Sequence, residues 1–211
     1  MSGSKNIDRY MQSCRTEFWQ GVFRIELESI LQDLVKGEEV LSVGCGPAII
    51  ESALSERGFS ITGLDVSQEA LDCAPDSVRT VVGRAEEMPF PESSFGAAIY
   101  VASLQFIEDY RKALEQTARV LRPEGRLIVL LLNPESDFFK RKLRDPNSYV
   151  RKIKHTELKG IEEVIAEYFN MHSEYLLGVK GDAIFESRDL TDAVLYIIRG
   201  TRKLMKKDKD A

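Results

Sequence analysis

The stretch VLSVGCGPAII, residues 40–50, combines a hydrophobic run, two glycines two positions apart and a proline. Its first four residues predict a short buried strand, and residues 44–46 predict a sharp turn into a helix. The first turn of such a helix carries unpaired N–H groups at the positive end of the helix dipole. We therefore expect a polar or anionic ligand over this turn.

Hydrophobic patterning places this strand first in a series that alternates with helices. Strands are predicted at residues 40–43, 60–64, 78–82, 97–102 and 126–132, and helices at 48–57, 68–74 and 110–121. Such alternation favours a parallel sheet with right-handed crossovers. The late strand-like segments 174–179 and 193–198 follow a further amphipathic helix, and we expect them to pair antiparallel.

The composition is that of a globular protein, with 43% hydrophobic and 30% charged residues in a chain of 211. No segment approaches the length of a membrane span, and the N-terminus lacks the apolar core of a signal peptide, so we expect a cytoplasmic protein. The net charge of −5 is unevenly spread, because residues 138–159 hold eight Lys/Arg against Asp145 and Glu157. We name this stretch the basic segment.

The three cysteines, Cys14, Cys45 and Cys73, are odd in number and form no CxxC pair. This pattern disfavours a disulfide framework and a zinc site, so we expect no metal. Two interpretations remain open: three unrelated cysteines, or a trio of thiols that binds a soft metalloid.

A dinucleotide is the first ligand to test against the glycine turn. Its fingerprint G-x-G-x-x-G fails here, because Ile49 stands where the third glycine belongs. Glu51 also adds negative charge near the place of a pyrophosphate. Asp65, 19 residues beyond Gly46 at the end of the second strand, is suited to accept hydrogen bonds from both ribose hydroxyls. These residues predict a nucleoside ligand without a pyrophosphate.

At this point the chain resembles the class I S-adenosylmethionine-dependent methyltransferases, in particular the group of small-molecule and quinone-type enzymes. The resemblance covers about residues 36–135. It is carried by four motifs in register, VLSVGCGPA, ITGLDVSQEAL, GRAEEMPFPESSFGAAIYVASLQFIED and ALEQTARVLRPEGRLIVLLL. Many relatives have glycine where Ala48 stands and an acidic residue where Arg84 stands.

The resemblance implies an α/β, Rossmann-like, doubly wound sheet of seven strands, in the order 3-2-1-4-5-7-6 with strand 7 antiparallel. It implies S-adenosylmethionine as cofactor, with S-adenosylhomocysteine as product. The glycines would approach the methionine part of the cofactor, and Asp65 would hold the ribose. Residues 66–67 and 84–86 would flank the adenine, and Val101 and Ala102 would pass beneath the methyl group. The implied cofactor-binding residues are Gly44, Cys45, Gly46, Asp65, Val66, Ser67, Arg84, Ala85, Glu86, Val101 and Ala102.

We expect a single methyltransferase domain over residues 1–211, which divides into four parts. These are an N-terminal helical lid (1–35), the cofactor-binding core (36–135), a basic insertion or lid (136–160), and a C-terminal helix with antiparallel strands (161–200). Acceptor choice in the family is made by the first and third parts. Tyr10, Phe18, Trp19 and Phe23 either wall an apolar acceptor pocket or form the buried face of a helix.

The expected activity is transfer of a methyl group to a small molecule by in-line displacement. The basic segment favours an anionic acceptor, while the acidic remainder of the chain disfavours nucleic acid. No catalytic base is identifiable, and the candidates near the acceptor are Gln105, which orients but takes no proton, and His155. The alternatives are a non-catalytic S-adenosylmethionine-binding sensor, or an RNA or protein methyltransferase that uses the basic segment.

Overall fold

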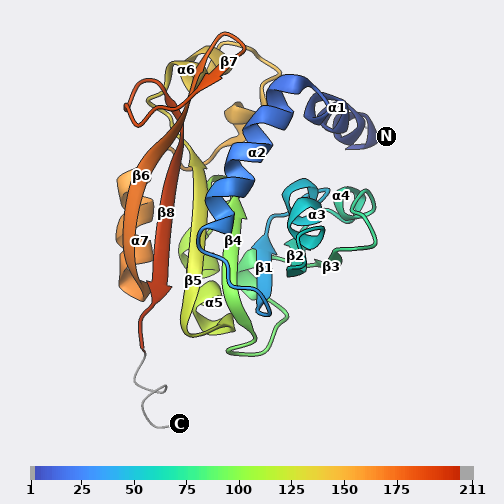
Figure 1. Cartoon of the computed structure of the whole chain (residues 1–211), viewed down its shortest axis with the longest axis vertical. Helices are drawn as coiled ribbons and strands as arrows, with labels where there is room; N and C mark the ends of the chain where they lie inside the picture. The colour runs from blue at the N-terminus through green and yellow to red at the C-terminus, as the bar shows by residue number, and fades with distance from the viewer. Residues whose placement is uncertain (1–2, 205–211) are drawn as a thin grey trace.

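The computed structural model describes residues 3–204 and shows a mixed β-sheet with helices on both faces (Figure 1). Residues 1–2 and 205–211 of the expected domain lie outside the described part. The strands are β1 Glu39–Val43, β2 Ser60–Asp65, β3 Arg79–Val82, β4 Phe95–Val101, β5 Leu121–Leu132, β6 Phe169–Lys180, β7 Ala183–Phe185 and β8 Ala193–Arg202. The α-helices are α1 Gly3–Cys14, α2 Glu17–Leu31, α3 Ile49–Ser55, α4 Gln68–Leu71, α5 Tyr110–Val120, α6 Asp137–Leu143 and α7 Leu158–Tyr168. Short 3₁₀ helices are η1 Ala85–Glu87, η2 Leu104–Phe106 and η3 Tyr149–Lys152.

The strand order in the described part is β3-β2-β1-β4-β5-β8-β6-β7. The first five strands of this order are parallel, and β8 pairs antiparallel with β5 and with β6. With β6 and β8 as the sixth and seventh predicted strands, the predicted order and the antiparallel seventh strand are confirmed. The carboxyl ends of β1, β2 and β4 therefore meet at one edge of the sheet, where open α/β sheets bind ligands.

The predicted count of seven strands is wrong, because the sheet has an eighth strand at its edge. β7 forms a hairpin with β6 across Gly181, whose φ of +63° is the left-handed conformation that glycine adopts readily. A strand of three residues is too short to show a period-two pattern in the sequence, which is why it escaped prediction. The hairpin packs on α2, since a Cβ at Gly21 would lie 2.8 Å from Cδ1 of Ile184.

Helices bury both faces of the sheet: α2 and α3 lie on one face, and α5 and α7 lie on the other (Figure 1). Along β5, Ile128 and Leu130 pack into the core beneath α2, while Leu127 and Val129 pack into the core beneath α5. A strand that is covered on both faces has a continuous apolar sequence, as residues 127–132 have. Among residues 3–204, no helix has the length and apolar character that crossing a membrane requires.

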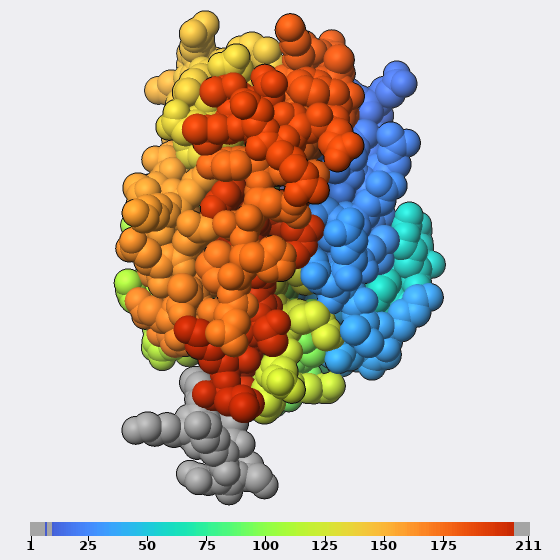
Figure 2. Space-filling view, turned by 60° about the vertical axis from the view of Figure 1, so that its left-hand side comes forward, coloured from blue at the N-terminus to red at the C-terminus, as the bar shows by residue number. Residues whose placement is uncertain are grey.

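One buried arginine ties α2 to the C-terminal strands. Arg199 in β8 donates from Nε to Asp33 at 2.7 Å, from Nη1 to Glu174 in β6 at 2.7 Å, and from Nη2 to Ser29 Oγ at 2.6 Å. Each nitrogen of the guanidinium group thus has a partner, and these bonds offset the cost of burying the charge of Arg199. Figure 2 shows the result on the surface, where the blue N-terminal segment lies against the orange and red C-terminal segment.

Two buried carboxyl groups lie where α2 meets α3. The side chain of Glu26 in α2 is 5% exposed and that of Glu51 in the first turn of α3 is 2% exposed. Burial raises the pKa of Glu26 to about 8 and that of Glu51 to about 7, and the charge of Glu51 adds to the rise at Glu26. Glu51 has a partner, since it accepts a hydrogen bond of 2.5 Å from Ser42 Oγ in β1.

Glu26 should therefore make the stability of the protein fall as the pH rises. The carboxyl group of Glu26 has a higher pKa in the folded state than in the unfolded state, so the folded protein binds the proton more tightly. The resulting contribution to the free energy of unfolding is complete below the unfolded pKa and is lost by about pH 8. We expect Glu26→Gln to raise the free energy of unfolding at pH 9 by about 1–3 kcal/mol and to change it little at pH 5. Urea denaturation at both pH values measures the difference.

Glu28→Gln is the matched control, because Glu28 lies on the exposed side of the same helix. It removes the same charge without removing a buried one, so its effect at pH 9 should be within about 0.5 kcal/mol. Equal effects of the two substitutions at pH 9 would contradict the burial of an ionisable Glu26.

Candidate functional site

The turn after β1 has a backbone that few residues other than glycine adopt. Gly44, Gly46 and Ala48 have φ values of +72°, +53° and +58°. Gly44 is also held close to the end of β4, because a Cβ there would lie 2.6 Å from Cβ of Ser103. Ala48 adopts the left-handed conformation at a cost in free energy that glycine would not carry.

The N–H groups of this turn are donated within the protein. Gly44 and Cys45 donate to the carbonyl of Leu64 at 2.7 and 3.3 Å, and Ala48 donates to the carbonyl of Cys45 at 3.0 Å. Gly46 donates to Asp65 Oδ2 at 2.8 Å, and Pro47 has no N–H. Residues 44–48 therefore donate every N–H group that they have within the protein, and the glycines leave room for the close approach of a ligand.

Asp65, at the end of β2, links the first two loops of the sheet edge. Its Oδ2 accepts from the N–H of Gly46, and its Oδ1 accepts from the N–H of Ser67 at 2.9 Å. The Ser67 hydroxyl caps α4 by accepting from the N–H of Ala70 at 3.2 Å, and serine is a favoured residue at this position of a helix. An ionised carboxylate has about four lone-pair sites, so two remain for further donors such as ribose hydroxyls.

The residues expected beside the adenine lie on the loops after β2 and β3. Val66 follows Asp65 and is 65% exposed, an apolar side chain left open at the sheet edge. Arg84 Nη2 forms an ion pair of 2.8 Å with Glu86 Oε1, and Ala85 begins η1 between them. The carbonyl of Asp65 accepts from the N–H of Gly83 at 2.9 Å, which brings this second loop beside the first.

The residues expected beneath the methyl group end β4. Val101 and Ala102 are half-buried, and Ala102 turns the chain with a φ of +47° while its N–H donates to the carbonyl of Leu130 at 2.9 Å. The next residue, Ser103, donates from Oγ to the carbonyl of Val43 at 2.5 Å. These bonds join the end of β4 to the glycine turn, so the structure brings both groups of predicted residues to one edge.

Gln105 and His155 are held by backbone groups. Gln105 is fully buried; its Nε2 donates to the carbonyls of Leu132 and His155 at 3.1 and 3.2 Å, and its Oε1 accepts from the N–H of Leu132 at 2.8 Å. His155 Nε2 lies 2.9 Å from the carbonyl of Ile107, and its ring meets Tyr110 edge-on at 4.7 Å. In this structure Gln105 thus fixes the end of the basic segment against β5.

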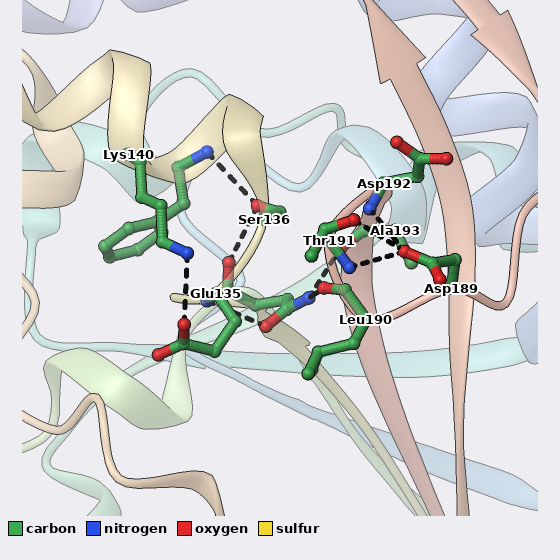
Figure 3. Close-up of polar contacts among 10 residues, drawn as sticks. Glu135, Ser136, Lys140, Asp189, Leu190, Thr191, Asp192 and Ala193 are labelled. Atoms are coloured by element: carbon green, nitrogen blue, oxygen red, sulfur yellow. Dashed lines mark hydrogen bonds and ion pairs between the residues drawn. The ribbon is translucent and has the colours of Figure 1, made fainter.

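The other end of the basic segment is anchored by the loops after β5 and before β8. Buried Asn133 donates from Nδ2 to the carbonyls of Leu190 and Ala193 at 2.7 and 2.8 Å. Ser136 Oγ donates to the carbonyl of Asn133 and caps α6 through the N–H of Phe139. Figure 3 shows how Asp189 closes the neighbouring loop by accepting from Thr191 and Asp192. Both ends of the segment are therefore fixed in place.

An aromatic groove of about 600 Å³ lies between the start of α2, α6 and the β6–β7 turn. Phe18 and Trp19 line it from α2 and Phe138 lines it from α6, with Arg141 and Lys142 placed 5.8 and 5.5 Å from the centre of the Phe138 ring. Of the four aromatic residues considered for a pocket, Phe18 and Trp19 thus face a groove. Phe23 stacks on Trp19 with ring centres 6.0 Å apart, and Tyr10 comes from α1.

The cysteines occupy three different environments. Cys14 is buried in α1, Cys45 lies in the glycine turn with Sγ against Gly63 of β2, and Cys73 is exposed after α4. Within residues 3–204, no three His, Cys, Asp or Glu side chains are grouped as metal ligands would be.

Glu26 is a buried carboxyl group that the sequence analysis did not single out. Its position predicts burial, because it falls four residues after Val22 and four before Ile30, two apolar residues of the same helix face. A carboxylate on that face is the signal that could have identified it.

Comparison with known proteins agrees with this geometry. Residues 41–129 match the family model of the methyltransferase domain. Over 98 residues the chain is 38% identical to the demethylmenaquinone methyltransferase of Corynebacterium glutamicum (strain R), covering 46% of this chain and 43% of that protein. It is 27% identical over 149 residues to an uncharacterized methyltransferase of Bacillus subtilis, covering 67% of this chain and 81% of that one. The chain thus spans less than half the length of the first of these curated relatives.

Solved structures extend the likeness to nearly the whole fold. A crystal structure from Thermotoga maritima, described as a SAM-dependent methyltransferase and possible histamine N-methyltransferase, superposes with a TM-score of 0.80 at 18% identity, covering 95% of this chain and 97% of that one. At that identity the likeness concerns the fold. Together with the matched domain, it shows that residues 41–129 are similar to a methyltransferase domain and that the chain has the Rossmann-like fold of S-adenosylmethionine-dependent methyltransferases.

Proposed function

We propose that this protein transfers the methyl group of S-adenosylmethionine to a small-molecule acceptor. The observation that carries the proposal is the pair of hydrogen bonds from Gly46 and Ser67 to Asp65, which places one carboxylate between the glycine turn and the second loop. That arrangement leaves room for methionine at the glycines and leaves two lone-pair sites for a ribose. The matched methyltransferase domain covers the same residues.

The proposed contacts follow the sheet edge from β1 to β4. Gly44, Cys45 and Gly46 would take the methionine part and Asp65 the ribose. The exposed side chain of Val66 would cover one face of the adenine, and Ala85 would meet its edge. The full set of residues proposed to bind the cofactor is Gly44, Cys45, Gly46, Asp65, Val66, Ser67, Arg84, Ala85, Glu86, Val101 and Ala102.

The cofactor supplies an activated methyl group on a sulfonium, so the protein's task is alignment. The ends of β1, β2 and β4 are joined by the bonds of Ser103, Asp65 and Gly44, which makes the donor end of the site rigid. A rigid site holds the acceptor atom in line with the breaking bond and lowers the entropic part of the barrier. Gln105 contributes by positioning the basic segment rather than by taking a proton.

A small molecule is the acceptor class that the relatives support. The first relative is named for a quinone precursor and the Thermotoga structure for an amine, and both names describe small molecules. An anionic acceptor, which the basic segment suggests, would meet Arg141 and Lys142, since both line the aromatic groove with Phe138.

The alternative readings have less support. Several cations of the basic segment are already engaged, since Lys140 pairs with Glu135 and Lys154 pairs with Glu108, which weakens the argument for RNA. A sensor without catalysis would bind the cofactor equally well. A panel of small acceptors, scored by release of S-adenosylhomocysteine, separates the enzyme from the sensor.

The ribose contact of Asp65 is testable by substitution. We expect Asp65→Ala to weaken S-adenosylmethionine binding by about 1–3 kcal/mol, which is roughly fivefold to 150-fold in Kd, because a half-buried hydrogen-bond acceptor is lost. Isothermal titration calorimetry of the wild-type chain and the variant measures both constants under the same conditions.

Two further variants separate recognition from folding. Asp65→Asn keeps an acceptor for one of the two loop N–H groups and should bind more tightly than Asp65→Ala. Asp76→Ala removes an exposed carboxylate before β3, at the other end of the strands, and should bind as the wild type does. An Asp65→Ala protein that is folded by circular dichroism and binds the cofactor with unchanged affinity would refute the ribose role.

A further inference from the structure

The aromatic groove between α2, α6 and the β6–β7 turn has the size of a small-ligand site. Its volume of about 600 Å³ falls within the range of about 300–1,000 Å³ that such sites occupy. The helix α6 and the strand β7 lie together at one end of the molecule, and the start of α2 reaches the same groove (Figure 1). Rings line the groove from α2 and α6, and charged side chains line it from α6 and the turn.

The apolar wall of the groove comes from two helices. Thr16 caps α2 by accepting from the N–H of Trp19 at 3.5 Å, which fixes Phe18 and Trp19 in the first turn of the helix. Their rings meet edge-on with centres 5.3 Å apart, and the Phe18 ring is stacked on that of Phe138 in α6 at 6.3 Å. Aromatic rings pack favourably against further rings in stacked and edge-on arrangements, so this wall suits a planar aromatic ligand.

The charged wall of the groove comes from α6. Arg141 and Lys142 follow Phe138 by three and four residues, so the three side chains lie on one face of the helix. The guanidinium and ammonium groups lie 5.8 and 5.5 Å from the centre of the Phe138 ring, within the range of cation–π contacts. Positive charge is therefore placed next to the rings of the apolar wall.

Neither cation has a counter-ion among the side chains that the structure describes. Lys140, on the same helix, forms an ion pair of 3.0 Å with Glu135, whereas no described carboxylate forms an ion pair with Arg141 or Lys142. An arginine can bind a carboxylate through two parallel N–H donors, and a lysine adds a point charge. Both cations are therefore available to an anion that enters the groove from solution.

Asp182 is the carboxylate of the lining. It lies on the β6–β7 turn, its side chain is exposed, and it opposes the binding of an anion. With Arg141 and Lys142 on α6, the described lining nevertheless has a net positive charge, so it favours an anion over an organic cation.

We propose that the groove binds an aromatic carboxylate, with its ring against Phe18 and Trp19 and its carboxylate group between Arg141 and Lys142. The rings of the apolar wall select a planar aromatic ligand, and the two cations select a negative charge on it. This inference goes beyond the proposed function, because the binding needs no cofactor and does not require that the ligand is the methyl acceptor.

Titration of the full chain without cofactor tests the proposal. The probes are 2-naphthoate, neutral 2-naphthamide and cationic 2-naphthylmethylammonium at neutral pH, with dissociation constants measured by calorimetry. Trp19 is the one tryptophan of the chain, so the single indole N–H resonance in a ¹⁵N–¹H correlation spectrum reports binding in the groove. We expect 2-naphthoate to bind at least about fivefold more tightly than either of the other probes and to shift this resonance.

Substitutions in the lining assign the preference to its charges. In the double variant Arg141→Gln/Lys142→Gln, 2-naphthoate and 2-naphthamide should bind within about twofold of each other. Lys140→Gln is the matched control, because it removes a cation of the same helix that does not line the groove, and it should retain the preference. Asp182→Asn should tighten the binding of 2-naphthoate by about twofold to fivefold and leave that of 2-naphthamide unchanged.

Several results would overturn the proposal. Equal binding of 2-naphthoate and 2-naphthamide, tighter binding of the cationic probe, or no binding of 2-naphthoate at millimolar concentration contradicts the preference for an aromatic anion. A preference that survives in a double variant folded by circular dichroism, or binding that leaves the Trp19 resonance unmoved, places the ligand outside the groove. A separate titration with S-adenosylmethionine tests the proposed function, and its failure would leave the groove site standing.

Discussion

The hydrogen bond from the Gly46 N–H to Asp65 Oδ2 is the constraint on which the cofactor half of the molecule depends. It joins the turn after β1 to the end of β2, and the second oxygen of the same carboxylate holds the Ser67 N–H at the start of α4. The N–H groups of residues 44–48 are donated inside the protein, so what these residues offer a ligand is close approach of the backbone at the glycines. A sulfonium nucleoside with a zwitterionic methionine suits such a turn, and a pyrophosphate does not.

A second group of contacts joins α2 to the C-terminal strands. Arg199 is buried with Asp33, Glu174 and Ser29 as partners, so its charge is compensated and it fastens α2 to β6 and β8. Glu26, on the same helix, is buried, and its Oε2 has no hydrogen-bond partner among the side chains that the structure describes, so it lowers stability at alkaline pH. Groups that a fold keeps in spite of such a cost are concentrated at functional sites.

The sequence predicted the strands and turns at the edge of the sheet well and the long-range side-chain contacts poorly, for physical reasons. Strands β1, β2 and β4 and the role of Ser67 as a cap follow from local patterns, so the edge where Gly44, Asp65 and Ala102 meet was accessible from the sequence. The strand β7 was missed because three residues carry no period. Glu26 and Glu51 come from helices whose packing is set by the tertiary fold, and Gln105 owes its role to the backbone of Leu132 and His155, contacts that no local pattern encodes.

A crystal structure of the chain with S-adenosylhomocysteine tests the central claim most directly, because that claim concerns where the cofactor lies. The account predicts ribose hydroxyls within about 2.6–3.2 Å of the Asp65 carboxylate, with the Gly46 N–H bond retained and the homocysteine chain against the glycine turn. A complex in which the ribose lies away from Asp65, or in which the glycine turn contacts no part of the ligand, would contradict it.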